Sequence, residues 1–274
     1  YDFVANTILY AKWRATWIAE VPTNHTLSGS GEKESPYLIS SALDLAYLAM
    51  QVQNGNTYTN KDGSRQFIEQ TAPINLTGKI WMPIGGSSLG ELKYDENGKL
   101  EAQTTLGEDV KLFGGIYNGR GFAIIGLETY NQKDASGNYL YNSLGLFGRT
   151  NGARFENVYI TNAKIYGKKN VGALVGENVV TNLVICGCFA KGEVEGTSST
   201  GGLVGKDAIA GTQILNSGFT GNVTSGSIIA GTIVGGIVKN SYAEVTTDIP
   251  FVGNGATIDA CVFSANGNKQ YYDD

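Results

Sequence analysis

A motif of one glycine, two apolar residues and a second glycine recurs through the second half of the chain, and it limits the possible folds more than any other feature. Its five occurrences are Gly145-Leu146-Phe147-Gly148, Ala173-Leu174-Val175-Gly176, Gly202-Leu203-Val204-Gly205, Thr232-Ile233-Val234-Gly235 and Pro250-Phe251-Val252-Gly253. The last glycines of successive motifs are 28, 29, 30 and 18 residues apart. A repeat of this length without a helical period indicates stacked β units.

Each repeat also contains a second apolar run that closes on an aromatic residue. The closing pairs are Val158-Tyr159, Cys188-Phe189, Gly218-Phe219, Ser241-Tyr242 and Val262-Phe263. One short apolar ridge cannot be buried within its own unit, so neighbouring units must stack in parallel, with equivalent residues about 4.8 Å apart. Crossover connections between parallel strands are nearly always right-handed. The sequence therefore predicts an all-β fold, a right-handed parallel β-helix (solenoid), with glycines at its corners.

One helix is predicted ahead of the repeats. Ser41-Ala42-Leu43-Asp44 has the spacing of a capping box, and Asn54-Gly55 is a C-cap signal. The apolar residues between them at helical spacing are Leu45, Leu48, Ala49 and Val52. Because an open end of a solenoid exposes core and strand edges, we expect this N-terminal helix to cap the stack.

Three polar turns predict hairpin excursions that project from the body of the solenoid. They are centred on Asp62-Gly63, Asn97-Gly98 and Ser136-Gly137-Asn138, each between residues able to pair as a small hairpin.

Charge and hydropathy limit the partners. The formal net charge is −5, with 20 Lys and Arg against 25 acids, so no basic stripe predicts nucleic-acid binding. No apolar run approaches the roughly 18 residues of a membrane span, so no membrane insertion is expected. The N-terminus lacks the pattern of a signal peptide, and we expect a monomeric module of a larger chain.

Three cysteines cannot form a closed disulfide framework. Cys186 and Cys188 share a strand face as near neighbours, and the repeat places Cys188 and Cys261 three units apart, about 14 Å at the spacing of parallel strands. A disulfide needs Cα atoms within roughly 7 Å. All three are therefore expected to be small free thiols in or near the core.

The glycine motif resembles the GLUG motif of bacterial cell-surface proteins, named for glycine, leucine, a bulky apolar residue and glycine. Three further stretches resemble the usual lead-in to such repeats: Ser35 to Ser40, Gly78 to Gly85 and Tyr117 to Phe122. The resemblance covers residues 30 to 267 and departs from the pattern where Ala173, Thr232 and Pro250 replace the first glycine. It implies an extracellular protein with a role in cell adhesion.

Residues 1 to 13 resemble the closing strand of an internalin-type B-repeat, a module that occurs in tandem on Gram-positive surfaces. This resemblance implies two segments. Residues 1–20 would be the end of a B-repeat-like module with its linker, and residues 21–274 a GLUG-type β-helix domain at the bacterial cell surface or cell wall.

The residues offer little catalytic chemistry. His25 is the single histidine and lies in a polar run outside the repeats, where we expect an exposed linker residue. One histidine cannot supply a His-Glu-x-x-His zinc site, and a Ser-His-Asp triad would have to recruit it. No metal, cofactor or catalytic residue is predicted.

A polysaccharide lyase or hydrolase remains as the enzymatic alternative, because pectin-degrading enzymes use parallel β-helices. Glu193 and Glu195 share a strand face, but neighbours at this spacing imply no pocket, and we interpret them as a solvated edge.

We therefore expect a non-enzymatic, adhesin-like module that presents an elongated surface to a host or environmental glycan or protein. Tyr130, Tyr139 and Tyr141, which flank the third excursion, are the candidate contact residues because tyrosine offers rigid amphipathic area. The alternative is a structural stalk that only spaces other domains from the cell.

Overall fold

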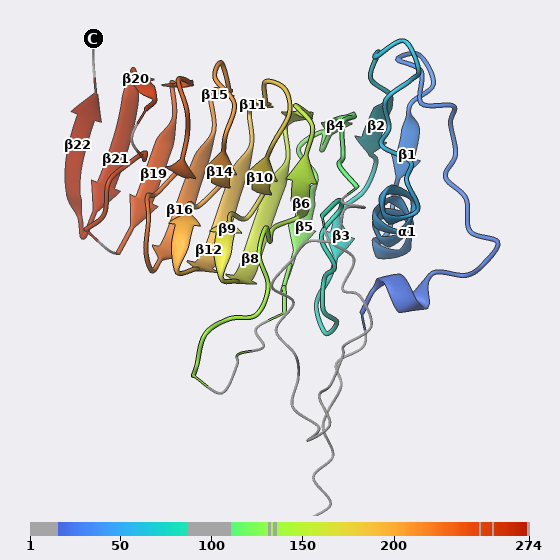
Figure 1. The fold of residues 1–274 in the computed structure, drawn as a ribbon, viewed down its shortest axis with the longest axis horizontal. Helices are drawn as coiled ribbons and strands as arrows, with labels where there is room; N and C mark the ends of the chain where they lie inside the picture. The colour runs from blue at the N-terminus through green and yellow to red at the C-terminus, as the bar shows by residue number, and fades with distance from the viewer. Residues whose placement is uncertain are drawn as a thin grey trace, which may run out of the picture.

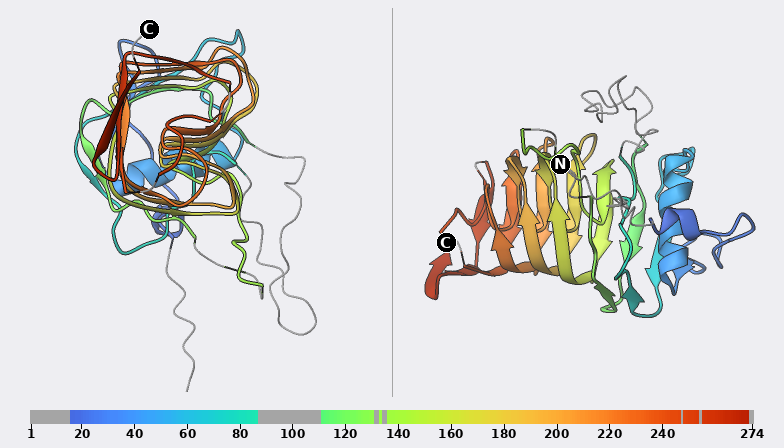
Figure 2. Two further views of the ribbon diagram at one scale, coloured as in Figure 1. Left: turned by 90° about the vertical axis from the view of Figure 1, so that its left-hand side faces the viewer. Right: turned by 90° about the horizontal axis from the view of Figure 1, so that it is seen from below.

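The computed structural model is mostly β, with one long α-helix and parallel sheets (Figure 1). The structure describes residues 16–86, 111–130, 133, 136–246, 248–253 and 255–272. Strands of successive repeats lie side by side along the long axis, and in the end-on view of Figure 2 they superimpose on one another.

Three sheets run along this stack. The first contains β1 (Tyr37–Ile39), β2 (Phe67–Gln70), β4 (Ile116–Asn118), β7 (Arg154–Glu156), β11 (Val184–Cys186), β15 (Gln213–Leu215), β18 (Ile237–Lys239) and β20 (Thr257–Asp259). The second contains β3 (Ile74–Asn75), β5 (Ala123–Ile125), β8 (Tyr159–Tyr166), β12 (Phe189–Glu195), β16 (Gly218–Val223), β19 (Tyr242–Val245), β21 (Cys261–Ala265) and β22 (Asn268–Tyr272). The third contains β6 (Phe147–Thr150), β10 (Val175–Asn178), β14 (Val204–Asp207) and β17 (Ala230–Thr232). A short pair, β9 (Lys169–Val171) and β13 (Ser198–Thr200), completes the described strands.

The chain visits the sheets in a fixed order, from β10 through β11, β12 and β13 to β14, and each visit adds a strand parallel to the one before. Only β22 is antiparallel within the three long sheets, because it returns from β21 as a hairpin. Each later repeat in the sequence therefore lies one position further along the stack.

The pairing register corrects the sequence alignment of the fourth repeat. Ala230 pairs with Val204 and with Val252, so the glycine that matches Gly205 is Gly231 and not Gly235. The last two steps between matching glycines are therefore 26 and 22 residues (231 − 205 and 253 − 231). The repeat shortens gradually toward the C-terminus, and no single step is anomalous.

The second glycine of each motif lies where backbones are in contact. A Cβ on Gly176 would lie 2.4 Å from the carbonyl carbon of Ser143, and one on Gly205 would lie 2.3 Å from the nitrogen of Val171. Gly231 is equally restricted, with the nitrogen of Thr200 at 2.4 Å. The third sheet therefore packs so closely against the backbone of the turn before that only glycine fits.

A single left-handed residue turns the chain from the first sheet into the second. These corner residues, each directly after a strand of the first sheet, are Asn157, Gly187, Asn216, Asn240 and Ala260, with φ between 48° and 66°. Each of the first four donates its backbone N–H to a carbonyl of the next turn at 3.0 Å. The hydrogen-bond ladder thus continues around the corner, which Asn and Gly tolerate best.

A ladder of hydroxyls and thiols lies directly inside this corner, at Cys188, Ser217, Ser241 and Cys261, all buried. The Ser217 hydroxyl accepts from the Cys188 N–H at 3.1 Å, and the Ser241 hydroxyl accepts from the Ser217 N–H at 3.3 Å. The Cys261 sulfur accepts from the Ser241 N–H at 3.4 Å. All three cysteines are free thiols, as predicted, and Cys188 and Cys261 are three turns apart.

The predicted helix is confirmed as α1 (Ala42–Gln53), whose N-cap Ser41 accepts from the Asp44 N–H. Its four predicted apolar positions are all buried. The helix lies beside β1 at the N-terminal end of the stack (Figure 1).

His25 is not the exposed linker residue that we expected. Its Nε2 lies 2.8 Å from a carboxylate oxygen of Asp44, and its ring packs beside Tyr47. Burial alone would raise the pKa of Asp44, but hydrogen bonds from Ser40, Ser41 and His25 outweigh it and hold that pKa below its usual value. The polar residues around His25 in the sequence do not predict this contact, because Asp44 is 19 residues away.

Two of the three predicted excursions are hairpins: Thr59 pairs antiparallel with Arg65, and Lys133 with Tyr139. The excursion at Asn97-Gly98 and the B-repeat resemblance at residues 1 to 13 lie outside the described residues. Trp17 beside the 3₁₀ helix η1 (Ile18–Glu20) donates to the Leu76 carbonyl at 3.0 Å, so residues just before position 21 contact the body. The proposed boundary at residue 20 stays a prediction.

Among the described residues, no helix has the length and apolar character needed to span a membrane.

Candidate functional site

The three candidate tyrosines have different environments. Tyr139 is buried, and its ring stacks on Tyr166 with centroids 6.1 Å apart, while the Lys133 ammonium lies 4.1 Å from the ring centroid. Tyr139 therefore offers little surface to a ligand, because this side chain packs between the excursion and the body.

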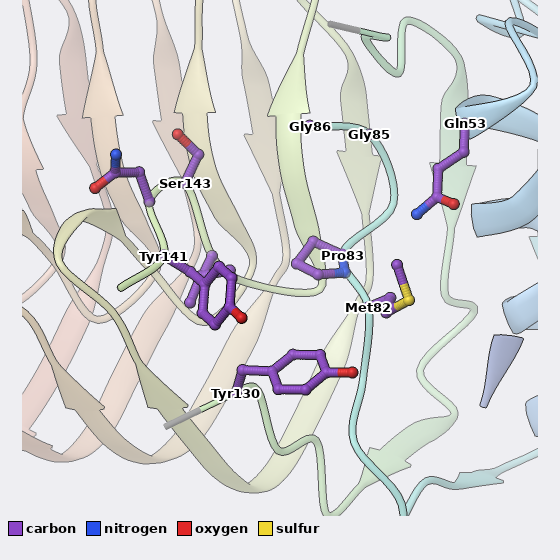
Figure 3. A pocket seen from close by; sticks show the side chains of 10 residues that line it. Gln53, Met82, Pro83, Gly85, Gly86, Tyr130, Tyr141 and Ser143 are labelled. Carbon is purple, nitrogen blue, oxygen red and sulfur yellow. The ribbon is translucent and has the colours of Figure 1, made fainter. Parts of the chain in front are cut away.

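Tyr130 and Tyr141 lie side by side, with ring centroids 5.6 Å apart, next to Met82 and Pro83 (Figure 3). The hollow that they line also reaches Gln53 at the end of α1. Its free volume is about 20 Å³, room for about one water molecule. These two tyrosines therefore line a narrow crevice that is too small for a sugar ring.

A more extensive feature is a column of aromatic side chains on the outer face of the second sheet. The register aligns Tyr159, Phe189, Gly218, Tyr242 and Val262 on successive strands, and Tyr271 of β22 lies opposite Val262. We call Tyr159, Phe189, Tyr242 and Tyr271 the aromatic column. Their exposed fractions are 38%, 36%, 40% and 64%. They are four of the seven large apolar side chains exposed in the described part of the chain.

Along each strand, the residue of the aromatic column is followed by a residue of the core. Ile160, Ala190 and Ala243, each one residue further on, are buried in the interior. A strand places successive side chains on opposite faces, so this burial directs the aromatic rings toward solvent.

Gly218 shapes the middle of the column. A Cβ at this position would lie 3.0 Å from two carbons of the Phe189 ring, so the ring extends over the glycine. The Tyr159 ring lies 5.5 Å from Phe189 at an interplanar angle of 37°. Tyr242 lies beyond the glycine, and its hydroxyl donates to Glu244 at 2.8 Å, which raises its pKa.

A polar hollow of about 250 Å³ adjoins the Tyr159 end of the column. Besides Tyr159 its lining residues are Asn118, Arg120, Gly121 and Asn157. Arg120 pairs with Glu69 at 2.9 Å, and the Asn157 amide donates to the Asn118 side-chain oxygen at 3.4 Å. Because Asn157 is the left-handed corner residue after β7, the fold itself holds its amide at this place.

Sequence reasoning missed the column because of a one-residue shift. The sequence pattern places the closing aromatics in one set, but Phe219 pairs with Ala190 and Ala243, and Phe263 also pairs with Ala243, so both face the interior. Tyr159, Phe189 and Tyr242 face outward. The distinguishing signal was the distance from the corner residue: the outward rings stand two positions after Asn157, Gly187 and Asn240.

Three acids of the repeat region have polar or charged partners. Glu193 accepts from the Tyr166 hydroxyl at 3.0 Å, and Glu195 lies 3.9 Å from the Lys133 ammonium. Glu177 is buried between Arg149 at 2.9 Å and Lys206 at 3.1 Å, across the register of β6, β10 and β14. Within the described ranges no group of His, Cys, Asp and Glu side chains is arranged to hold a metal ion.

Comparison with known proteins gives limited similarity. No family model matches the chain. Halomucin from Haloquadratum walsbyi is 29% identical over 180 residues, which are 65% of this chain, and the chain spans about 2% of the length of that protein. A crystal structure from Bacteroides ovatus, described provisionally as an immunoglobulin A1 protease, has a TM-score of 0.49 at 16% identity, over 90% of this chain and 82% of that one.

Proposed function

We propose that the chain is an adhesin-like module of a bacterial surface protein, which presents one face of a closed, right-handed β-solenoid to a ligand. The observation that carries this proposal is the aromatic column. Apolar side chains scattered singly over a surface are ordinary, whereas apolar side chains that lie next to one another on a surface mark an interaction site. The binding site then lies on the second sheet, away from the Tyr130 and Tyr141 crevice.

Two further observations support a surface protein. Similarity to Halomucin is compatible with a module of that kind, and the repeated motifs resemble GLUG units. The close backbone packing at Gly176 and Gly205 explains why the motif ends in glycine. We propose further that the protein lies at a bacterial cell wall and that a B-repeat precedes residue 21.

We also propose that the module is not an enzyme. In support, Glu193 and Glu195, the only carboxylate pair singled out from the sequence, each have another partner: Glu193 accepts from the Tyr166 hydroxyl, and Glu195 pairs with Lys133. Retaining and inverting glycosidases need two carboxylates flanking one bond, with one of them protonated.

Surface display and adhesion are tested together. Antibodies raised against the purified chain should label intact cells that carry the gene, and external protease should remove the label. Beads coated with the chain should adhere to a glycan or matrix-protein array in a saturable manner. Labelling only after permeabilisation would contradict the surface role. Surface labelling without adhesion to any array would favour the alternative, a structural stalk.

A further inference from the structure

We propose that the aromatic column binds an extended, uncharged polysaccharide, with one end of the sugar chain in the hollow beside Tyr159. This inference rests on the proposed ligand-binding role and adds the chemical class of the ligand. The column crosses five strand steps from Tyr159 to Tyr271, about 24 Å at the spacing of neighbouring strands. Such a length suits a chain of several sugar residues.

The shape of the column favours a sugar chain over a protein partner. Two residues further along each strand, the outer face carries Thr161, Lys191, Thr220 and Glu244. The apolar stripe is therefore one side chain wide. A stable protein interface buries about 800 Å² on each partner around a broad apolar centre, which this stripe does not offer.

The rings have the chemistry to bind sugars. The axial C–H groups of a pyranose form an apolar patch with slight positive charge, and the face of an aromatic ring is negative, so the two surfaces attract and exclude water together. Phe189 extends over Gly218 and remains 36% exposed, so it can serve as a platform for one sugar ring. Tyr242 offers a second ring two strands further on.

The charges of this face indicate an uncharged ligand. Exposed Lys164, Lys191 and Lys269 are matched on the second sheet by Glu193, Glu195 and Glu244, and Lys164 pairs directly across from Glu193. Arg120 in the hollow is already paired with Glu69. A polyanion would find no excess of positive charge here, and the whole chain carries a net charge of −5.

The hollow supplies the polar contacts that rings alone lack. The side-chain amides of Asn118 and Asn157 offer donors and acceptors beside Tyr159, and the described residues give the Tyr159 hydroxyl no hydrogen-bond partner. Sugar hydroxyls both donate and accept, so paired amides suit them. A terminal sugar in the hollow would fix the position of the chain on the column.

The test is binding of soluble polysaccharides to the purified chain, measured by affinity electrophoresis and calorimetry. The neutral probes are mannan, xylan, laminarin and hydroxyethyl cellulose, and the acidic probes are polygalacturonate and hyaluronan. We expect at least one neutral probe to bind, with an affinity that changes little between roughly 50 mM and 500 mM salt, since screening acts on charged contacts. The double substitution Phe189→Ala and Tyr242→Ala should weaken binding about tenfold or more.

Matched variants separate the site from general effects. Leu38→Ala and Val180→Ala remove apolar side chains elsewhere that are at least as exposed as Phe189, and they should leave affinity unchanged. Asn157→Gly keeps the left-handed corner but removes the amide, and should weaken binding severalfold. Circular dichroism and thermal unfolding verify that each variant is folded.

Each other outcome overturns the proposal. Binding of acidic probes alone, with strong salt dependence, would show the wrong ligand class and leave the surface role standing. If the folded Phe189→Ala and Tyr242→Ala double variant bound the probe with full affinity, the binding site would not be the aromatic column. No binding by any probe, together with no adhesion on the arrays, would contradict both this inference and the proposed function.

Discussion

Gly176, Gly205 and Gly231 occupy positions where a hydrogen is the only side chain that the neighbouring backbone admits. Each glycine belongs to the third sheet, and the backbone that it meets belongs to the turn before: at Ser143 for Gly176, in β9 for Gly205 and in β13 for Gly231. The two apolar residues before the glycine are buried in the core. The motif therefore combines core burial with close backbone approach within four residues.

This contact predicts the effect of Gly205→Ala. A methyl group there would lie 2.3 Å from the Val171 nitrogen and 2.4 Å from the Asn170 carbonyl carbon, so backbone must move. Overpacking of this kind costs about 1–3 kcal/mol or more. Gly63→Ala is the control: no atom lies within 4 Å of the added methyl group, so the only cost is that of its φ of +84°, about 1–2 kcal/mol, and Gly205→Ala should cost more. Thermal and urea unfolding measure both, and equal losses would contradict the close-packing explanation.

The corner ladder predicts that a thiol can replace a hydroxyl. Ser217 accepts from the Cys188 N–H and donates to the Leu215 carbonyl at 2.7 Å. Ser217→Ala leaves that buried N–H unpaired and should cost about 1–3 kcal/mol. Ser217→Cys should cost clearly less, because cysteine already fills this position at Cys188 and Cys261. Chemical denaturation compares the two variants, and an alanine variant as stable as the cysteine variant would show that the ladder contributes nothing.

At the scale of elements, the third excursion is held to the second sheet by aromatic and charged contacts. Tyr139 stacks on Tyr166 of β8, and Lys133 lies over the Tyr139 ring and near Glu195 of β12. The Tyr139 side chain also hydrogen-bonds to Glu195. Both phenols thus donate to carboxylates only while they keep their protons.

These contacts predict release of the excursion at alkaline pH. Burial and the hydrogen bond to Glu193 raise the pKa of Tyr166 to about 12, and burial with Glu195 raises that of Tyr139 well above its usual value. Because folding raises both pKa values, this stabilisation is complete below pH ~10 and is lost as the pH rises through about 12. Limited proteolysis near residues 133–139 should accelerate over that interval.

Single substitutions test the same assignment. Tyr139→Phe removes the hydrogen bond to Glu195 and should make the excursion sensitive to protease at neutral pH. Tyr271→Phe, which changes an exposed phenol on β22, should not. If Tyr139→Phe resists protease at neutral pH as well as the unmodified chain does, the Tyr139 phenol does not hold the excursion.

Local sequence signals predicted the elements whose partners are near in sequence or set by the repeat. The Ser41 cap, the buried face of α1 and the two described hairpins are of this kind. Register was harder, because Thr232 to Gly235 fits the motif better than Ile228 to Gly231. The structure selects the latter through backbone bonds such as the Gly202 N–H to the Ile228 carbonyl at 2.7 Å. His25 and the aromatic column also depend on pairings that no local pattern encodes.

At the scale of the whole molecule, each turn contacts mainly the turn before and the turn after. Strand pairs such as β11 with β15 and β15 with β18 connect neighbours only, and α1 lies at the N-terminal end beside β1 (Figure 1). In such an architecture, stability is close to a sum of terms for units and for the interfaces between adjacent units. The loss of stability caused by a substitution at one end should therefore become smaller with distance along the stack.

Leu48→Ala tests this distance dependence. Leu48 is fully buried in α1, and its truncation should cost about 2–5 kcal/mol locally. Hydrogen exchange should show reduced protection in α1, β1 and β2, while amides of β15 and β18 keep theirs, because several intact interfaces separate them from the cavity. Leu38→Ala, at a half-exposed site on β1, should change protection little at either end. An equal loss of protection in β2 and β18 after Leu48→Ala would instead show that the stack unfolds as a single cooperative unit, with the helix stabilising every turn.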